Sequence, residues 1–99
     1  MMLELVDVYE LPWAAEAMWP MAQECATETN AKLGSFYAHQ AFVASRPYRQ
    51  WFLIREDGHW LGHARITKQQ ELEIYINPND RGKDYAMQVA LMLPLRSAS

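Results

Sequence analysis

The C-terminal part of the chain shows the clearest change of hydrophobic pattern. From residue 71 to residue 76 apolar side chains alternate with polar ones, as in a strand with two different faces. Residues 77–80 (Asn-Pro-Asn-Asp) then end the strand, because proline cannot continue the hydrogen-bond ladder and Asn and Asp favour turns. From Arg81 the apolar residues return at helical spacing up to Leu93, so we expect a tight loop at residues 81–86 that opens a helix. The apolar residues of the strand are Leu72, Ile74 and Ile76.

The N-terminal part predicts a strand followed by a helix. Residues 3–9 alternate weakly between apolar and polar side chains, which indicates a first strand. Pro12 is well placed at the first position of a helix, and apolar residues recur every three or four positions up to Cys25. Pro20 interrupts this stripe, because a proline removes one helical hydrogen bond and clashes with the preceding turn. We therefore expect the helix to kink or split near Trp19.

A polar segment precedes a second, shorter helix. Residues 27–32 are polar, and Gly34 ends this segment. Ser35 is a good N-cap, because its hydroxyl accepts from a free backbone N–H of the first helical turn. We therefore expect a helix over residues 36–44, closed by Pro47.

Two strands joined by a tight turn give the strongest strand signal. Residues 50–55 and 59–67 flank an Asp57-Gly58 pair, which is the pair that a type I′ hairpin turn requires. A second reversal at residues 68–70 leads back to the strand that starts at residue 71. The order of elements is then β-α-α-β-β-β-α. This order predicts an α+β fold with a mainly antiparallel four-stranded sheet.

Composition narrows the class of protein. The 99 residues, about half of them apolar, suffice for one domain, which we take as residues 1–99. A formal net charge of −3 argues against nucleic-acid binding, which needs a basic face. One cysteine, Cys25, excludes an internal disulfide and suits a reducing compartment. No stretch approaches the roughly 20 apolar residues of a membrane span, and no signal sequence is recognisable, so we expect a cytoplasmic protein that binds no membrane.

The histidines do not predict a metal site. His59 and His63 are four residues apart, which in a strand places them on one face about 13 Å from each other, too far for one zinc ion. His39 falls in the second helix and has no partner at ligand spacing. We therefore expect no bound metal.

The connection into the last helix has the chemistry of an anion site. Residues 81–86 (Arg-Gly-Lys-Asp-Tyr-Ala) are basic at their start and are expected to open a helix. At a helix N-terminus the backbone N–H groups are free and the macrodipole is positive, so this is a natural seat for a pyrophosphate. The alternative is an ordinary β–α connection with a solvated basic turn.

This segment resembles the acyl-CoA-binding segment of the GNAT superfamily of N-acetyltransferases. The family pattern is Arg/Gln-x-x-Gly-x-Gly/Ala after a strand that ends in a proline-containing turn. The chain matches it at Pro78, at residues 81–83 and at Ala86, whereas the central glycine of the pattern falls on Asp84. The order of elements also resembles the N-terminal half of the family fold. The resemblance implies a short or truncated, partial GNAT-like fold that lacks the usual C-terminal strands.

The resemblance also implies an activity, the transfer of an acyl group from acetyl-CoA to an amine. A backbone N–H near Ile74 to Ile76 would polarise the thioester carbonyl, and a carboxylate would take a proton from the incoming ammonium. Glu73 is the candidate base and Glu71 the reserve, since both point to one face of the strand; the alternative is a pair of solvated glutamates. The residues expected to contact acyl-CoA, mainly through backbone amides, are Ile74, Ile76, Arg81, Gly82, Lys83, Asp84, Tyr85 and Ala86.

An aspartate in place of the family's central glycine lowers the expected affinity for acetyl-CoA. The carboxylate of Asp84 would crowd the diphosphate and repel it by about a few kcal/mol, which Arg81 and Lys83 offset only in part. We therefore expect weak or absent acetyl-CoA binding. Without a ligand, an acidic residue in the first helical turn simply complements the helix dipole.

The alternative function is a catalytically inactive GNAT-fold binding protein, an inhibitor or adaptor of the kind that a phage encodes. Residues 71–77 would form a sheet edge, whose unpaired N–H and C=O groups beside apolar side chains invite a second chain. We expect a homodimer or a protein partner at this edge. An aromatic face is the other candidate contact surface, formed by Trp13, Trp19, Tyr48, Trp51 and Trp60.

Overall fold

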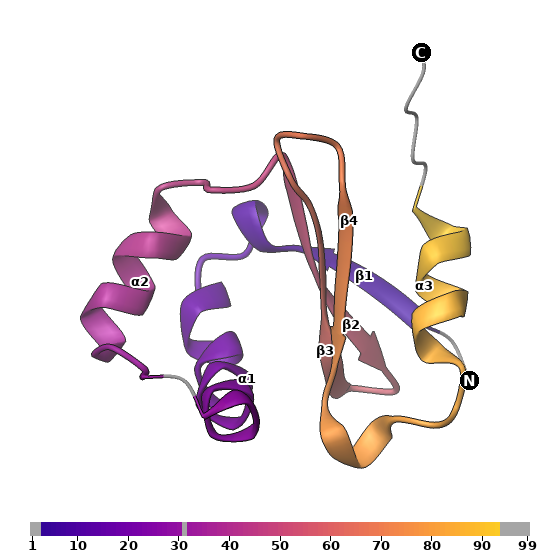
Figure 1. Ribbon diagram of the computed structural model, residues 1–99. Coiled ribbons are helices and arrows are strands. Elements are labelled where there is room, and N and C mark those ends of the chain that lie inside the picture. Colours follow the sequence, from indigo (N-terminus) through magenta and orange to yellow (C-terminus); the bar gives the residue numbers. More distant parts are fainter. Residues whose placement is uncertain (1–2, 31, 94–99) are drawn as a thin grey trace.

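The structure, a computed structural model, describes residues 3–30 and 32–93 and has an α+β fold (Figure 1). Three helices and a four-stranded antiparallel sheet follow one another in the order β-η-α-α-β-β-β-η-α, where η is a 3-10 turn. The predicted class and the predicted order of helices and strands are confirmed. The elements are β1 (Leu3–Asp7), η1 (Val8–Glu10), α1 (Ala14–Thr29), α2 (Phe36–Ala44), β2 (Gln50–Glu56), β3 (His59–Ile66), β4 (Leu72–Ile76), η2 (Pro78–Asp80) and α3 (Tyr85–Met92).

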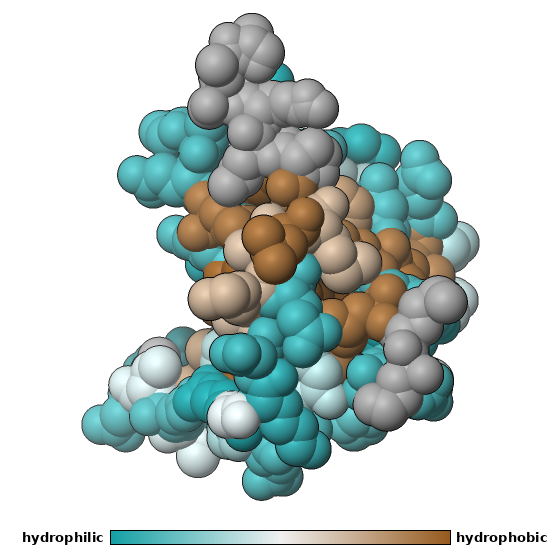
Figure 2. Space-filling view, turned by 90° about the vertical axis from the view of Figure 1, so that its right-hand side faces the viewer, coloured by the Kyte–Doolittle hydropathy of each residue, from teal (hydrophilic) through white to brown (hydrophobic). Residues whose placement is uncertain are grey.

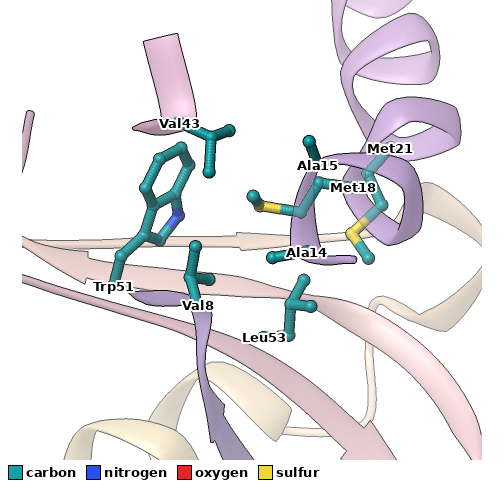
Figure 3. Packing of buried hydrophobic residues seen from close by; sticks show 8 residues of the cluster. All are labelled: Val8, Ala14, Ala15, Met18, Met21, Val43, Trp51 and Leu53. Atoms are coloured by element: carbon teal, nitrogen blue, oxygen red, sulfur yellow. The ribbon is translucent and has the colours of Figure 1, made fainter. Parts of the chain in front are cut away.

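The sheet lies between two helical layers, with α1 and α2 on one face and α3 on the other (Figure 1). Each face has its own buried hydrophobic cluster. The cluster beneath α1 and α2 contains Val8, Ala14, Ala15, Met18, Met21, Val43, Trp51 and Leu53 (Figure 3). The cluster beneath α3 contains Ile54, Leu61, Ala64, Ile76, Val89 and Leu93. The alternating faces of the strands therefore serve two separate cores.

The strands lie side by side in the order β1-β2-β3-β4, and each neighbouring pair is antiparallel. In the turn between β2 and β3, Asp57 has φ 51° and Gly58 has φ 80°. Both central residues thus have the positive φ that a type I′ turn requires, and the predicted hairpin is confirmed. Within the described residues β4 pairs only with β3, so it forms an edge of the sheet, as expected.

Gly62 allows β3 and β4 to approach each other closely. Its register partner across the two strands is Ile76. A Cβ atom at residue 62 would lie 2.0 Å from the carbonyl oxygen of Tyr75, which is far inside van der Waals contact. Only a residue without a side chain fits here.

The first strand is shorter than predicted, because residues 8 and 9 belong to the turn η1 and not to β1. The Oδ1 atom of Asp7 accepts from the backbone N–H of Tyr9 at 2.9 Å, which is a local capping bond and ends the strand. The Tyr9 hydroxyl donates to the backbone oxygen of Tyr48 at 2.8 Å and accepts from its N–H at 3.0 Å. These bonds hold the turn against the segment that leads into β2.

We expected a kink or a split near Trp19; helix α1 runs as one helix through Pro20, so the split does not occur. The helix also starts two residues after Pro12 and extends to Thr29, into the segment that we described as polar. Thr27 and Thr29 donate their hydroxyls to backbone carbonyls one turn earlier, at 3.0 and 2.9 Å, so their side chains do not compete with the helix.

Helix α2 has the predicted bounds and the predicted cap. The hydroxyl oxygen of Ser35 accepts from the N–H of Ala38 at 3.1 Å. The helix is tied to α1 by His39, whose Nε2 lies 3.1 Å from the carbonyl oxygen of Ala15. The two helices therefore form one unit above the sheet.

Helix α3 begins at Tyr85, within the segment of residues 81–86 that we expected to lead into the helix. Gly82 has φ 90° and Asp84 has φ 62°, and a right-handed helix cannot contain either backbone conformation. Asp84 thus stands before the helix as its N-cap and not inside its first turn. The residues from Arg81 to Asp84 form a turn that connects η2 to the helix.

Candidate functional site

A cavity of about 410 Å³ lies between α1, α2 and the face of the sheet that α3 does not cover. Its volume is in the range of sites for small organic molecules. Apolar side chains form most of its wall, and several polar side chains from the strands converge on it. The lining residues are Met18, Ala22, Cys25, Ala26, Thr29, Lys32, Leu33, His39, Phe42, Trp51, His63, Arg65, Glu73, Ile74 and Tyr75.

An ion pair between Arg65 and Glu73 forms one side of the cavity. The two residues are direct partners on β3 and β4, and the Arg65 Nε donates to Oε1 of Glu73. The guanidinium also lies over the Tyr48 ring, 4.4 Å from its centroid. The side chains are 31% and 46% exposed, so a ligand in the cavity can reach both charges.

His63 stands in the cavity wall as a neutral imidazole. The Trp51 indole Nε1 donates to its Nδ1 at 3.3 Å. An indole nitrogen only donates, so Nδ1 must carry no proton, and the neutral ring has its proton on Nε2. Burial, together with the nearby charges of Arg65 and His39, lowers the pKa of His63 to about 4.

Tyr75 continues the row of rings across the sheet. Its ring centroid lies 5.6 Å from that of His63, its register partner on β3, and the planes are tilted by 30°. Burial raises the pKa of Tyr75 to about 12, with neighbouring Cys25 and Glu28 acting in the same direction. The phenol therefore stays protonated and can donate a hydrogen bond across the whole neutral range.

Arg81 binds groups of the protein itself. Its Nε donates to the carbonyl oxygen of Ile76 at 2.8 Å, and its two terminal nitrogens donate to the two carboxylate oxygens of Glu28, one of them at 2.9 Å. The guanidinium also lies 5.3 Å from the Tyr75 ring centroid. The hydrogen bond from Arg81 holds the pKa of Glu28 below its usual value. This residue, which sequence analysis assigned to acyl-CoA, joins the C-terminal end of α1 to the end of β4.

The outer edge of β4 presents the backbone groups of alternate residues. The N–H of Asn77 donates to the carbonyl oxygen of Leu61 on β3 at 2.7 Å, so odd-numbered residues of β4 face β3. The N–H and C=O groups of Leu72, Ile74 and Ile76 consequently point to the open edge. The carbonyl of Ile76 is the one that Arg81 takes.

The N-terminus of α3 is not capped by a side chain. Asp84, the N-cap residue, makes no side-chain hydrogen bond to the helix, and its side chain is exposed. The Tyr85 hydroxyl donates to Oε1 of Glu56 at 2.8 Å, which raises the pKa of the phenol and fixes the helix start to the end of β2. Gly82 and Lys83 lie exposed in the preceding turn. The first amides of the helix have no intrahelical acceptor, as at any helix start.

The structure separates the two candidate bases. Glu73 lines the cavity, whereas Glu71 lies just before β4 and is exposed. The carbonyl oxygen of Glu71 accepts from the backbone N–H of Thr67, and its own N–H donates to the Thr67 hydroxyl oxygen. The residues expected to contact acyl-CoA are also distributed over two places. Ile74 contributes to the cavity wall and Ile76 is buried beneath α3, while the residues from Arg81 to Ala86 form the turn and the first helical residues.

Of the residues that line the cavity, only Glu73 and Ile74 were expected to take part in acyl transfer, and Trp51 was expected in the aromatic contact face. The available signal was the strand period: Trp51, His63 and Tyr75 fall on the same face of three adjacent strands. The proposed aromatic contact face also needs a correction. Trp51 is only 4% exposed and belongs to the core, while Trp13 is 48% exposed and packs against the Trp60 ring.

The described residues, 3–30 and 32–93, can also be searched for metal-binding clusters and for membrane-spanning helices. In this part of the chain no three side chains of His, Cys, Asp or Glu are close enough together to hold a metal ion. No helix in the same ranges is both long and apolar enough to cross a membrane.

Comparison with known proteins gave no match: no family model fits the chain, and no similar curated protein or solved structure was found. The residues themselves must therefore carry any functional assignment.

Proposed function

We propose that the chain is a GNAT-like N-acyltransferase domain that transfers an acyl group from acetyl-CoA to an amine held in the cavity. The support comes from the arrangement of β4. Glu73 directs its carboxylate to the cavity, and the next residue, Ile74, directs its N–H to the open edge of the sheet. Two adjacent residues thus provide a proton acceptor, which faces the cavity, and a backbone N–H donor, which faces the open edge of the sheet.

Under this proposal the two groups have separate roles. The Glu73 carboxylate takes a proton from the ammonium of the acceptor, directly or through water, and makes the amine nucleophilic. The N–H of Ile74 donates to the carbonyl oxygen of the thioester, where negative charge develops during the attack. The amine nitrogen forms the new bond to the carbonyl carbon, the carbon–sulfur bond breaks, and the thiol leaves with a proton. Arg65 already pairs with the Glu73 carboxylate, so this pair must open before Glu73 can take a proton, and we expect slow turnover.

Acetyl-CoA fits the chain only in part. The uncapped amides at the start of α3 and the exposed Lys83 suit a diphosphate, which they would hold by hydrogen bonds and charge. The carboxylate of Asp84 lies beside the same amides and opposes an anion, and Arg81 already binds Glu28. We therefore expect affinity for acetyl-CoA to be weak.

Titration calorimetry with acetyl-CoA tests the proposal. We expect binding that reversal of charge in Lys83→Glu abolishes and that the matched surface variant Lys68→Glu leaves unchanged. Transfer to an amine, followed by release of the free thiol, should stop in Glu73→Gln and persist in Glu71→Gln. If neither binding nor thiol release occurs with the wild-type chain, the acyltransferase assignment is wrong.

A second candidate, a GNAT-fold binding protein without catalysis, is favoured by the apolar face around α3. Apolar residues cluster on the face of the molecule that carries this helix (Figure 2). Met87, Leu91 and Met92 are 62%, 81% and 44% exposed there. Strand β4 is the last strand of the sheet in the described residues, and the backbone groups on its open edge are available for pairing with another strand. We propose that a second copy of the chain or a partner protein adds a strand at this edge.

Sedimentation of the wild-type chain and two variants tests the second candidate. Ile74→Pro removes an N–H that points away from β3, so it blocks strand addition and leaves the bonds between β3 and β4 in place. Ile74→Val keeps that N–H and is the matched control. We expect a dimer at micromolar concentration for the wild type and the valine variant, and a monomer for the proline variant. A wild-type monomer would exclude self-pairing.

A further inference from the structure

We propose that the ligand of the cavity is a large apolar or aromatic α-amino acid, bound as the zwitterion. Binding of the amino acid does not depend on the proposed function. Only the claim that the amine of this ligand is then acylated rests on the proposed function. The cavity combines an apolar wall with one acidic group and several hydrogen-bond donors. An amino acid has a group for each of these: an apolar side chain, an ammonium and a carboxylate.

The apolar wall accounts for the side chain of the ligand. Met18 and Trp51 are 2% and 4% exposed, so they form a fixed floor, and Phe42 and Leu33 contribute partly exposed apolar surface. Two alanines of α1 also line the cavity, and their small side chains leave the space free. An apolar side chain placed here leaves water and contacts these groups, which is favourable at roughly 25 cal/mol per Å² of buried area.

The ion pair on the strands accounts for the amino acid head group. Arg65 uses Nε for Glu73, and a guanidinium has five N–H donors, so the remaining donors suit a carboxylate. Among the residues that the structure describes, Glu73 is the only acidic side chain in the cavity wall, and its carboxylate can accept from an ammonium. The head group of a zwitterion therefore extends the existing pair into a ring of alternating charges.

Two further donors strengthen the preference for a carboxylate. Lys32 lines the cavity at its exposed side. His63 keeps its proton on Nε2 because Trp51 donates to Nδ1, and no residue that the structure describes accepts from Nε2. A ligand with only an ammonium leaves these donors and the remaining donors of Arg65 without an acceptor. A ligand with only a carboxylate gives Glu73 no ammonium from which to accept.

Three probes with the same phenyl ring separate the contributions of the ammonium and the carboxylate to binding. L-phenylalanine has both groups, phenethylamine lacks the carboxylate, and 3-phenylpropionate lacks the amine. Their affinities are measured by calorimetry on the full chain. We expect L-phenylalanine to bind at least tenfold more tightly than either truncated probe. Equal affinity of phenethylamine or 3-phenylpropionate, or no binding of any of the three, overturns the inference.

The chain provides a matched control for the ion pair. Arg55 and Glu4 form a second cross-strand pair, with Nε and Oε1 at 3.0 Å, outside the cavity. We expect Arg65→Gln to weaken L-phenylalanine binding at least tenfold and Arg55→Gln to leave it unchanged, with thermal melts showing that both variants fold. A similar loss in both variants would overturn the assignment of Arg65 to the ligand.

Acyl transfer is measured separately, so that the two proposals fail in different ways. If L-phenylalanine binds with the expected preference but is not acylated, the zwitterion site stands and the acyltransferase function is wrong. If phenethylamine is acylated as fast as L-phenylalanine and binds as tightly, the acyltransferase function stands and the amino acid site is wrong.

Discussion

Arg81 and Glu28 lie 53 residues apart in the chain and form a two-point contact, in which the guanidinium donates to both carboxylate oxygens. Glu28 belongs to the last turn of α1, and Arg81 follows η2. The same guanidinium donates to the carbonyl oxygen of Ile76 at the open edge of β4. One side chain thus fixes α1, the edge strand and the connection to α3 relative to one another.

Removal of either partner of this contact should lower the melting temperature. We expect Arg81→Gln and Glu28→Gln each to destabilise the fold modestly, and the double variant to be no less stable than the single ones, because the two residues act on each other. Lys83→Gln, a neighbouring exposed cation, is the control and should leave the melting temperature unchanged. Additive losses in the double variant would show that the two side chains stabilise the fold independently.

Burial of neutral His63 should make the stability depend on pH. Its pKa is about 4 in the folded chain and near 6.5 when unfolded, so between these values the unfolded chain binds a proton that the folded chain does not. Stability therefore falls as the pH decreases from about 6.5 to 4, by about 3 kcal/mol. Urea denaturation at several pH values measures this.

The variant His63→Gln should remove that pH dependence, because glutamine keeps an acceptor for Trp51 and does not titrate. His59→Gln is the control, since the side chain of His59 is 65% exposed. It should leave the decrease between pH 6.5 and 4 in place. An unchanged decrease in His63→Gln would mean that another group causes it.

Gly62→Ala should destabilise the chain by at least about 3 kcal/mol, because the new methyl group would overlap the carbonyl oxygen of Tyr75 and force β3 and β4 apart. Gly34→Ala is the matched control. A Cβ atom at residue 34 would make an ordinary contact of 3.5 Å with the Cβ atom of Ala38. The free energy of unfolding of this variant should therefore stay within about 0.5 kcal/mol of the wild type. Chemical denaturation measures the free energy of unfolding of both variants, and a similar value for the two would contradict the prediction.

Asp84→Gly should stabilise the chain by about 0.5 kcal/mol, because the left-handed backbone at φ 62° costs less for glycine than for a residue with a side chain. Under the proposed function it should also increase the affinity for acetyl-CoA. Asp84→Asn separates the two effects, since asparagine tolerates this backbone conformation and has no charge. Higher affinity in both variants assigns the effect to the charge, and higher affinity in the glycine variant alone assigns it to the backbone.

Local side-chain chemistry made part of the fold predictable. Asp57-Gly58 dictates its turn through the positive φ of both residues, and Ser35 marks the start of α2 through one side-chain hydrogen bond. These signals act over two or three residues, so they depend little on the rest of the chain. The strands from residue 50 to residue 76 followed from this turn and from the alternation of apolar and polar residues, which is also a local pattern.

Features that depend on distant contacts were not predictable. The side chain of Arg81 binds Glu28, 53 residues away, and the carbonyl oxygen of Ile76, and no local pattern indicated this contact. The cavity consists of residues from five helices and strands and the segment after α1, and its volume depends on how α1 and α2 sit above the sheet. The charge pair of Arg65 and Glu73 becomes visible only once β3 and β4 are in register.

The position of β1 has a consequence for the way the chain folds. Strands β2, β3 and β4 are joined by short turns, so their pairing closes only small loops, whereas β1 reaches β2 only after both α1 and α2 have been placed between them. Because closing a long loop costs entropy before any contact forms, the three C-terminal strands should assemble early and β1 should join last. The N-terminal strand is therefore the part of the sheet that should open first and exchange its amide hydrogens fastest.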